Sequence, residues 1–281
     1  MKNLIFTACY GTQINFDMTN AMVANLRVVG YTSDIIVLSD KNWMPADKDV
    51  RVIVISNPEG PILWKASLPE GVAKGYDAIL YVDSDGVWWR SPDTILALVS
   101  DKLIISRIRF QLQYDLYNLR LFSATERKLL ADGGLVDPKQ RSINAGAFLI
   151  RGEKYTTMCA IWKKEWTASS KPELHVGDQP PLQLLICQKQ IEYDYFPENM
   201  VLFPKVSKFA LPDETTVFAH FAGFPANDVG TKDCIAAMAD YPATVKRITD
   251  AIQGQIDKGK KLLEAATPKP LDVPAPEAPK E

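Results

Sequence analysis

Two aspartates follow directly on a short apolar run in the first third of the chain. Residues 79–82 are too few for a helix and are typical of a strand buried on both faces of a mainly parallel sheet. Asp83 and Asp85 come immediately after, and alternate residues of an extended chain project to the same side. Gly86 is interpreted as the residue that lets the backbone turn behind them. The spacing therefore predicts two carboxylates that converge on one cation, at a site for a phosphate-bearing ligand.

A divalent cation held by two carboxylates needs further ligands, so a third side chain is expected. Of the two histidines, His220 lies in a second apolar, strand-like run, residues 216–223, whereas His175 has no comparable neighbour and is interpreted as a surface residue. Each residue also has a simpler explanation, because aspartates cap turns and histidines occur in cores with their rings hydrogen-bonded. The joint occurrence of Asp83, Asp85 and His220 favours a metal site.

Length and composition are those of an ordinary soluble protein. A chain of 281 residues with 47% hydrophobic residues has enough apolar surface for one large α/β domain, with or without an appendage. The formal net charge of -2 gives no overall basic field, so nucleic acid is not the expected partner and only a local basic patch would bind it. The first apolar stretch is too short for a signal peptide and no later one reaches membrane-spanning length, so we expect a cytoplasmic protein.

The cysteines are scattered within apolar segments and show no metal-binding spacing. This distribution indicates buried, reduced thiols and a reducing compartment. The four positions are Cys9, Cys159, Cys187 and Cys234.

The alternation of strand-like and helical segments is typical of a Rossmann-like α/β fold, with a mainly parallel central sheet and flanking helices. Gly30 marks the end of the first helix, and residues 58–69 are interpreted as a loop because glycine and proline interrupt them. Strands are expected at residues 4–9, 35–38, 50–55, 79–82, 103–105, 143–150, 191–196, 200–203 and 216–223, and helices at about 15–29, from 155 and from 180. Ligands of such sheets bind beyond the carboxyl ends of the strands, so residues 7–13 and 83–86 are expected on one rim.

Three later segments bear on function. Residues 107–122 mix arginines with aromatics, which favours an amphipathic element with inward aromatics over a nucleic-acid or sugar surface. The small residues 144–146 open a strand and allow close approach by a ligand. Asp178 and Gln179 precede two prolines, which predicts a helix N-terminus, where Asp178 is equally well explained as an N-cap.

Composition changes after about residue 240. Residues 241–266 are charged and amphipathic, which is typical of a helix, and the proline-rich residues 267–281 hold too little apolar surface to fold. We therefore expect a folded domain over residues 1–240, a C-terminal helix and a disordered tail.

Four separated segments together resemble the retaining GT-A glycosyltransferases, especially the glycogenin and lipopolysaccharide galactosyltransferase group and the xyloglucan xylosyltransferase group. The segments are residues 76–85 with the DxD motif, 144–146 with 148–151, 178–179 and 220–223, in the order of the family. The resemblance covers residues 4 to about 223 and implies a GT-A fold. It also implies transfer of a sugar, with retention of configuration, from a nucleotide-diphosphate sugar. UDP is the default nucleotide, and the acceptor is a hydroxyl of a glycan, protein, lipid or other molecule.

The resemblance implies a role for each matched residue. Asp83, Asp85 and His220 would hold Mn²⁺ or Mg²⁺ against the diphosphate, while Asp178 would hydrogen-bond the donor sugar and Gln179 would lie near its anomeric carbon. The implied donor-binding residues are Thr7, Ala8 and Tyr10 at the base, Lys65 at the nucleotide, Asn144, Ala145 and Gly146 at the sugar, and Ser84, Gly223 and Lys232.

Two positions depart from the family pattern. Ala226 stands where the family often has a lysine that clamps the diphosphate, and Lys232 is only a weak substitute. Residues 11–13 lack the acidic or asparagine-rich character common in the first loop, which leaves the nucleotide open.

Other classes share parts of this pattern. Residues 82–87 resemble the DxDGT motif of haloacid-dehalogenase-type phosphatases, whose first aspartate is a nucleophile, but Val87 replaces the threonine and the motif is not on the first strand. A sugar nucleotidyltransferase would have a glycine-rich phosphate loop after the first strand, and residues 7–13 lack one. A non-catalytic sugar-nucleotide-binding relative would keep the fold, although the intact acids and His220 argue against it.

Overall fold

The structure is a computed structural model that describes residues 1–56, 61–111, 140–169, 178–203 and 212–220. The predictions for His175, Cys234, Ala226 and the segments 241–266 and 267–281 lie outside the described residues, so the domain boundaries remain predictions. No helix within the described residues is long and apolar enough to cross a membrane.

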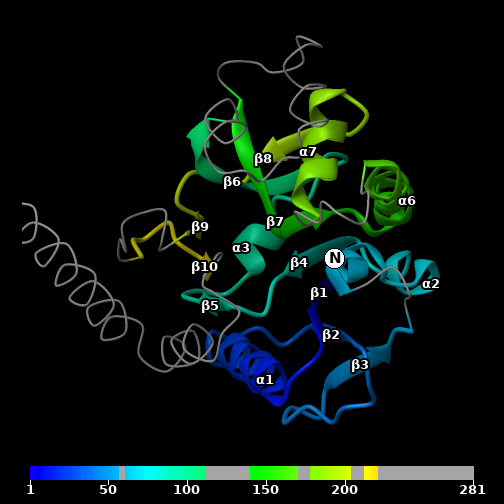
Figure 1. Cartoon of the computed structure of the whole chain (residues 1–281). Helices are drawn as coiled ribbons and strands as arrows, with labels where there is room; N and C mark the ends of the chain where they lie inside the picture. Colours follow the sequence, from blue (N-terminus) through cyan, green and yellow to red (C-terminus); the bar gives the residue numbers. More distant parts are fainter. Residues whose placement is uncertain (57–60, 112–139, 170–177, 204–211, 221–281) are drawn as a thin grey trace, which may run out of the picture.

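A seven-stranded sheet forms the centre of the fold, in the order β3-β2-β1-β4-β7-β6-β8 (Figure 1). Neighbouring strands are parallel except at β7, which is antiparallel to both β4 and β6. The mainly parallel α/β sheet is thus confirmed. The strands are β1 (Asn3–Cys9), β2 (Asp34–Ser39), β3 (Val50–Val54), β4 (Ala78–Val82), β6 (Leu103–Gln111), β7 (Arg141–Ile150) and β8 (Tyr193–Tyr195).

Strand β4 lies in the middle of this sheet, and all of its residues are buried. Tyr81 is in register with Phe6 of β1 on one side and with Phe148 of β7 on the other. The rings of Tyr81 and Phe148 stack at 5.2 Å between centroids, and Phe6 meets Tyr81 edge-on at 5.0 Å. This aromatic row packs around β4, the strand that directly precedes Asp83.

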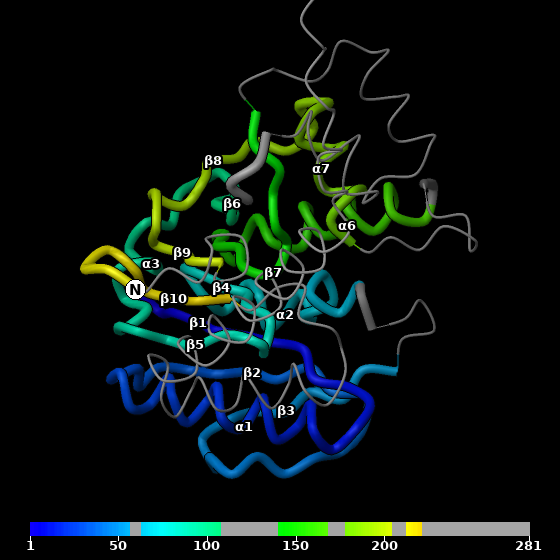
Figure 2. The backbone as a smooth tube through the Cα atoms, turned by 60° about the vertical axis from the view of Figure 1, so that its left-hand side comes forward, coloured from blue at the N-terminus to red at the C-terminus, as the bar shows by residue number. Residues whose placement is uncertain are grey.

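Helices cover both faces of the sheet. Helices α2 (Glu70–Ala73), α6 (Gly152–Ser169) and α7 (Gln179–Cys187) pack on one face, and α1 (Gln13–Val28) and α3 (Asp93–Leu96) pack on the other. Each face of the sheet has its own apolar core, and alternate residues of β1 contribute to the two cores. Phe6 packs in the core beneath α2, α6 and α7, and Ile5 packs in the core beneath α1 and α3. The tube view shows the same layering (Figure 2).

Some expected bounds change. Gly30 follows α1 with a φ of 93°, as expected for a helix-ending glycine. The expected loop over residues 58–69 contains a 3₁₀ helix, η1 (Pro61–Ala66), and strand β6 continues to Gln111, beyond the expected residues 103–105.

A second, three-stranded sheet lies beside the end of β4. It consists of β5 (Gly86–Trp88), β10 (Phe218–His220) and β9 (Val201–Leu202), in the order β5-β10-β9. Strand β10 runs antiparallel to β5 and pairs His220 with Gly86. Residues 134 positions apart in sequence are thereby paired, and His220, the only histidine of the described residues, comes to lie beside the two aspartates.

Candidate active site

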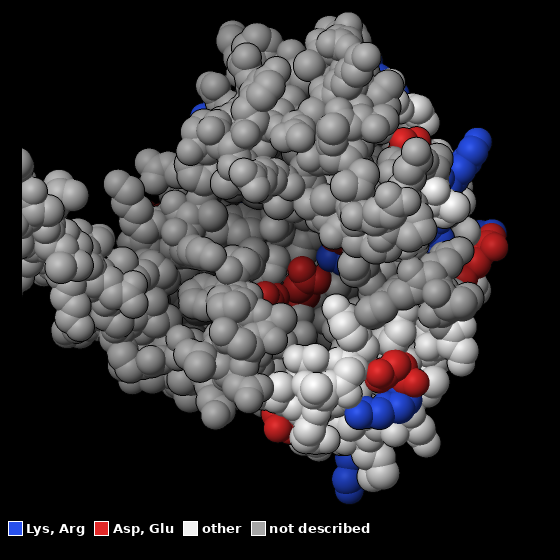
Figure 3. Space-filling view, in the orientation of Figure 1, with Lys and Arg blue, Asp and Glu red and all other residues white. Residues whose placement is uncertain are grey.

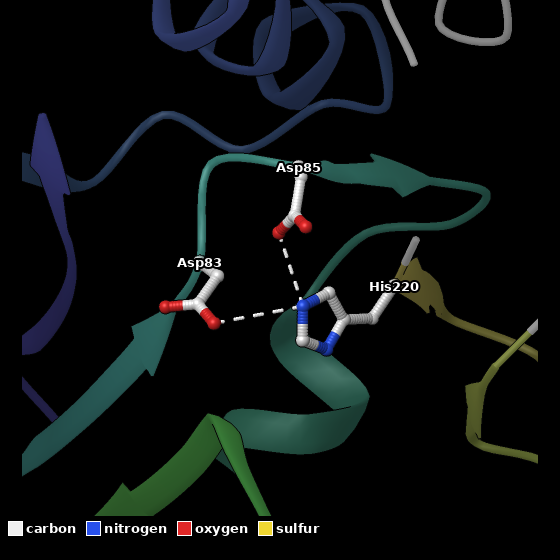
Figure 4. Close-up of side chains that lie close together, drawn as sticks. All are labelled: Asp83, Asp85 and His220. Atoms are coloured by element: carbon white, nitrogen blue, oxygen red, sulfur yellow. Dashed lines mark ion pairs between the residues drawn. The ribbon is translucent and has the colours of Figure 1, made fainter. Parts of the chain in front are cut away.

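The turn between β4 and β5 carries Asp83 and Asp85, and β10 supplies His220 to the same place (Figure 4). The backbone N–H of Asp83 donates to the carbonyl of Gly146 at 2.7 Å, which attaches the turn to β7. His220 Nε2 lies 3.0 Å from Asp85 Oδ1 and 3.6 Å from Asp83 Oδ2. One ligand atom from each residue lies within 4.8 Å of the others, so the three predicted ligands converge.

The polar atoms of this cluster fit a divalent ion. Asp85 Oδ1 is buried without a hydrogen bond and faces the His220 ring, while His220 Nδ1 is also buried without a partner. Gly146 maintains the space, because a Cβ there would lie 2.6 Å from Asp83 Oδ2 and closer still to the His220 ring. Carboxylates suit Mn²⁺ and Mg²⁺, and a neutral imidazole completes such a set. Asp83, Asp85 and His220 can therefore hold the ion that the sequence predicts.

Protonation of the cluster follows from its charges. Burial lowers the pKa of His220, but the Asp85 and Asp83 carboxylates together outweigh this effect and raise the pKa above its ordinary value. Burial raises the pKa of Asp83, while Lys65 and His220 together hold it below its ordinary value. A metal ion would therefore compete with a proton for the His220 ring.

The structure explains the glycine at position 86 by packing, and not by the backbone turn inferred from the sequence. Within the described residues the glycines with positive φ are Gly11 and Gly30, so the backbone conformation at Gly86 does not require a glycine. A Cβ at Gly86 would instead overlap the ring of Phe218. The absence of a side chain allows β10 to pack against β5 and thus to place His220.

Lys65 is a buried cation that joins three parts of the site. Its Nζ lies 2.7 Å from Asp178 Oδ2 and 3.3 Å from Asp83 Oδ1, and it donates to the carbonyl of Ala145 at 3.2 Å. Burial lowers the pKa of Lys65, but Asp178 and Asp83 raise it above its ordinary value, so the side chain is a permanent cation. Lys65 thus connects Asp83, one of the three candidate metal ligands, to Asp178 at the start of α7.

Asp178 occupies the N-cap position of α7 but makes no side-chain capping hydrogen bond. Its carboxylate pairs with Lys65 instead, and its carbonyl accepts from Trp162 Nε1 at 2.9 Å. The N-cap explanation is therefore wrong for the side chain. Gln179 is the first residue of α7 and is half-buried.

The remaining predicted site residues lie around this cluster. Asn144 Oδ1 accepts from the N–H of Gly146 at 2.8 Å, and Ser84 is buried between the two aspartates of the turn. Thr7 is buried within β1, two residues before the strand ends, and its hydroxyl has no hydrogen-bond partner; Ala8 is half-buried. Gly223 and Lys232 lie outside the described residues.

Tyr10 is the exposed member of the rim formed by the ends of β1 and β4. Its ring meets that of Trp64 edge-on at 5.5 Å. Burial, and then the Asp83 carboxylate, raise the pKa of the Tyr10 hydroxyl above its ordinary value. Strands β1 and β4 are parallel neighbours, so their carboxyl ends lie at the same edge of the sheet and form the expected common rim.

Three polar residues near the site make hydrogen bonds that the sequence does not predict. Tyr81 donates its hydroxyl to Asp83 Oδ1 at 2.5 Å. Tyr155, a buried residue of α6, donates to the carbonyl of Lys65 at 2.8 Å. Gln183 is fully buried and accepts from the N–H of Ile143 at 2.9 Å, which joins α7 to β7. A glutamine inside the apolar run of residues 182–186 was the one available signal.

The two aspartates of the cluster are partly open to solvent, because their side chains are 33% and 31% exposed. In the space-filling view, acidic atoms with a basic group beside them are visible inside a recess of the molecular surface (Figure 3). A recess that combines acidic and basic groups can receive a polar ligand together with a metal ion.

Two solved structures share this architecture. The apo structure of the bifunctional glycosyltransferase WbbM has a TM-score of 0.60 at 12% identity, over 88% of this chain and 51% of that chain. The galactosyltransferase LgtC, in complex with donor and acceptor sugar analogs, has a TM-score of 0.52 at 16% identity, over 84% of this chain and 95% of that chain. This chain thus spans about half of the length of WbbM.

No protein-family model and no curated protein sequence matches the chain. The resemblance to these two glycosyltransferases is therefore one of three-dimensional structure at low sequence identity. It agrees with the mixed sheet, the flanking helices and the position of the DxD aspartates at the end of β4. The chain has the GT-A fold of these glycosyltransferases.

Proposed function

We propose that the chain is a metal-dependent glycosyltransferase that moves a sugar from a nucleotide-diphosphate sugar, with UDP as the expected nucleotide, to a hydroxyl acceptor. The observation that carries this proposal is the convergence of Asp83, Asp85 and His220 at the carboxyl end of β4, in a GT-A fold. WbbM and LgtC are both glycosyltransferases, and LgtC was solved with donor and acceptor analogs. These neighbours give no support to a phosphatase, a nucleotidyltransferase or a non-catalytic protein.

The three ligands would hold Mn²⁺ or Mg²⁺, which when bound supplies positive charge to stabilise the departing diphosphate. Lys65 adds a fixed cation beside them, because its two carboxylate partners keep it protonated. Buried charges of this kind stabilise developing negative charge without having to reorganise. The chain's own residues thus favour departure of a phosphate-bearing leaving group.

Retention of configuration is part of the proposal. In the described cluster, Asp178 is the carboxylate that is not a proposed metal ligand, and it is paired with Lys65 at 2.7 Å. A carboxylate held in this way is a poor general base, and its neighbour Gln179 is not a base at all. A same-face reaction needs no protein base, since the departing phosphate can accept the proton of the acceptor hydroxyl. Asp178 and Gln179 are then left to orient the donor sugar.

The test is calorimetric titration of the protein with UDP, GDP and their sugars, with and without Mn²⁺, together with analysis of the products of donor turnover. We expect Mn²⁺-dependent binding and release of nucleoside diphosphate, both of which are lost in Asp85→Ala. Asp49→Ala, at an exposed aspartate directly before β3 on the edge of the sheet, is the matched control and should behave as the wild type.

Different products separate the alternatives. Release of inorganic phosphate from phosphomonoesters would indicate a phosphatase, and undiminished turnover in EDTA would contradict the metal-dependent mechanism. With an acceptor found by screening, proton NMR of the product assigns the anomer. A β-linked product from an α-linked donor would contradict retention.

A further inference from the structure

The hydroxyl of Tyr81 is directed at the first metal-ligand candidate from within the sheet. Tyr81 is 2% exposed and lies in the aromatic row with Phe6 and Phe148. Its hydroxyl donates to Asp83 Oδ1 at 2.5 Å, and Lys65 Nζ lies 5.0 Å from the centre of its ring. Packing on both sides keeps the ring in place, so the hydroxyl is a rigid donor.

The two oxygens of Asp83 have different neighbours. Oδ1 receives the Tyr81 hydroxyl and lies 3.3 Å from Lys65 Nζ. Oδ2 faces His220 Nε2 at 3.6 Å, on the side where Asp85 also lies (Figure 4). One oxygen is therefore engaged by the protein and the other faces the metal cluster.

We propose that Tyr81 is a positioning residue of the metal site: together with Lys65 it holds Asp83 Oδ1 and thereby presents Oδ2 alone to the divalent ion. This inference rests on the proposed function, because it assumes that Asp83 is a metal ligand. It goes further by assigning one carboxylate oxygen to the ion. Hydrogen bonds to a ligating carboxylate orient it and make up part of the site's affinity.

Removing the hydroxyl tests the assignment without removing the ring. Tyr81→Phe keeps the aromatic row but frees Asp83 Oδ1 to rotate toward the ion. Loss of such a partner costs about 10- to 100-fold in metal affinity. If the hydroxyl only stabilised the fold, the variant would lose thermal stability and keep the wild-type affinity for the ion.

The measurement is titration with Mn²⁺ alone, in which the free ion is followed by its electron paramagnetic resonance signal, so no turnover is needed. Tyr31→Phe is the matched control, because Tyr31 is also buried and donates its hydroxyl to a backbone carbonyl, that of Asp34 at 3.3 Å. We expect the wild type and Tyr31→Phe to bind equally and Tyr81→Phe to bind at least about 10-fold more weakly.

The outcomes separate the two hypotheses. Equal Mn²⁺ affinity of Tyr81→Phe and the wild type, with binding lost in Asp85→Ala, would overturn the role of Tyr81 and leave the proposed function intact. Wild-type binding that Asp85→Ala does not weaken would overturn the metal site itself, and with it the role of Tyr81.

A second measurement does not depend on whether Tyr81→Phe folds. In a crystal structure of the wild type with Mn²⁺, Asp83 should bind the ion through Oδ2 only, with Oδ1 still within hydrogen-bond distance of the Tyr81 hydroxyl. An Asp83 that binds the ion through both oxygens, or through Oδ1, would overturn the proposal.

Discussion

Replacing Gly146 by alanine should abolish binding of the divalent ion in a protein that still folds. The added Cβ would lie 2.6 Å from Asp83 Oδ2 and 2.8 Å from Asn144 Oδ1, and it would be closer still to the His220 ring. An ordinary contact requires at least about 3.4 Å, so Asp83 Oδ2 would have to retreat by about 0.8 Å. Metal–ligand bonds tolerate errors of only about 0.2 Å, so two of the three ligands would leave their positions.

The cost to folding should be smaller than the cost to binding. Crowding one methyl group into a packed site typically costs about 1–3 kcal/mol, because neighbouring side chains shift to relieve the overlap. Gly71→Ala is the matched control, since Gly71 lies in α2 with no atom within 4 Å of the added Cβ. In a helix this replacement should be neutral or stabilise by up to about 1 kcal/mol.

The assay combines thermal unfolding with titration by Mn²⁺, for the wild type and both glycine variants. Gly146→Ala should show a lowered Tm and no measurable ion binding, and Gly71→Ala should bind as the wild type does. A folded Gly146→Ala protein with wild-type Mn²⁺ affinity would refute the argument, since it would mean that the ion does not bind between Asp83 and His220.

Two further predictions concern buried groups. Lys65→Met should lower the free energy of unfolding in denaturant by about 3 kcal/mol, because Asp83 and Asp178 lose their buried cation. The control Lys74→Met removes a surface ion pair and should cost less than about 1 kcal/mol. Burial raises the pKa of Cys9 from 9.0 to about 11 and that of Cys159 to about 12, so at pH 8 both remain thiols. Peptide-resolved alkylation of Cys9 at pH 8 should therefore be at least about 100-fold slower in the native state than in guanidinium, and equal rates would contradict its burial.

The residues of the metal cluster were predictable because strong local signals mark them. A buried strand that ends in carboxylates must expose them at the edge of the sheet, and this holds for Asp83 and Asp85 whatever surrounds them. The apolar run before His220 likewise predicted a strand, which is β10. The burial of Cys9, Cys159 and Cys187 followed from their apolar neighbours in the same way.

Contacts between distant segments could not be read from local patterns. Lys65 lies 18 positions before Asp83 and 113 before Asp178, and no periodicity relates three such positions. The sequence could not decide whether Asp178 is an N-cap or a site residue. Capping is determined by neighbours in the chain, whereas the ion pair of Asp178 with Lys65 depends on the fold. Local pattern alone likewise predicted a turn at Gly86. The structure shows that the ring of Phe218, on the distant strand β10, leaves no room for a side chain at this position.

The site depends on the direction of β7, which is antiparallel to its neighbours β4 and β6. No local sequence pattern within β7 indicates this direction. Val82, the last residue of β4, pairs with Ala147, so residues 144–146 extend past the end of β4 to the rim. They reach it because β7 is antiparallel to β4; in a parallel arrangement the start of β7 would lie at the opposite edge of the sheet. The reversal allows the Gly146 carbonyl to accept from the N–H of Asp83 and the Ala145 carbonyl to accept from Lys65. One antiparallel strand in a mainly parallel sheet therefore brings the predicted sugar-binding segment against Asp83 and Lys65.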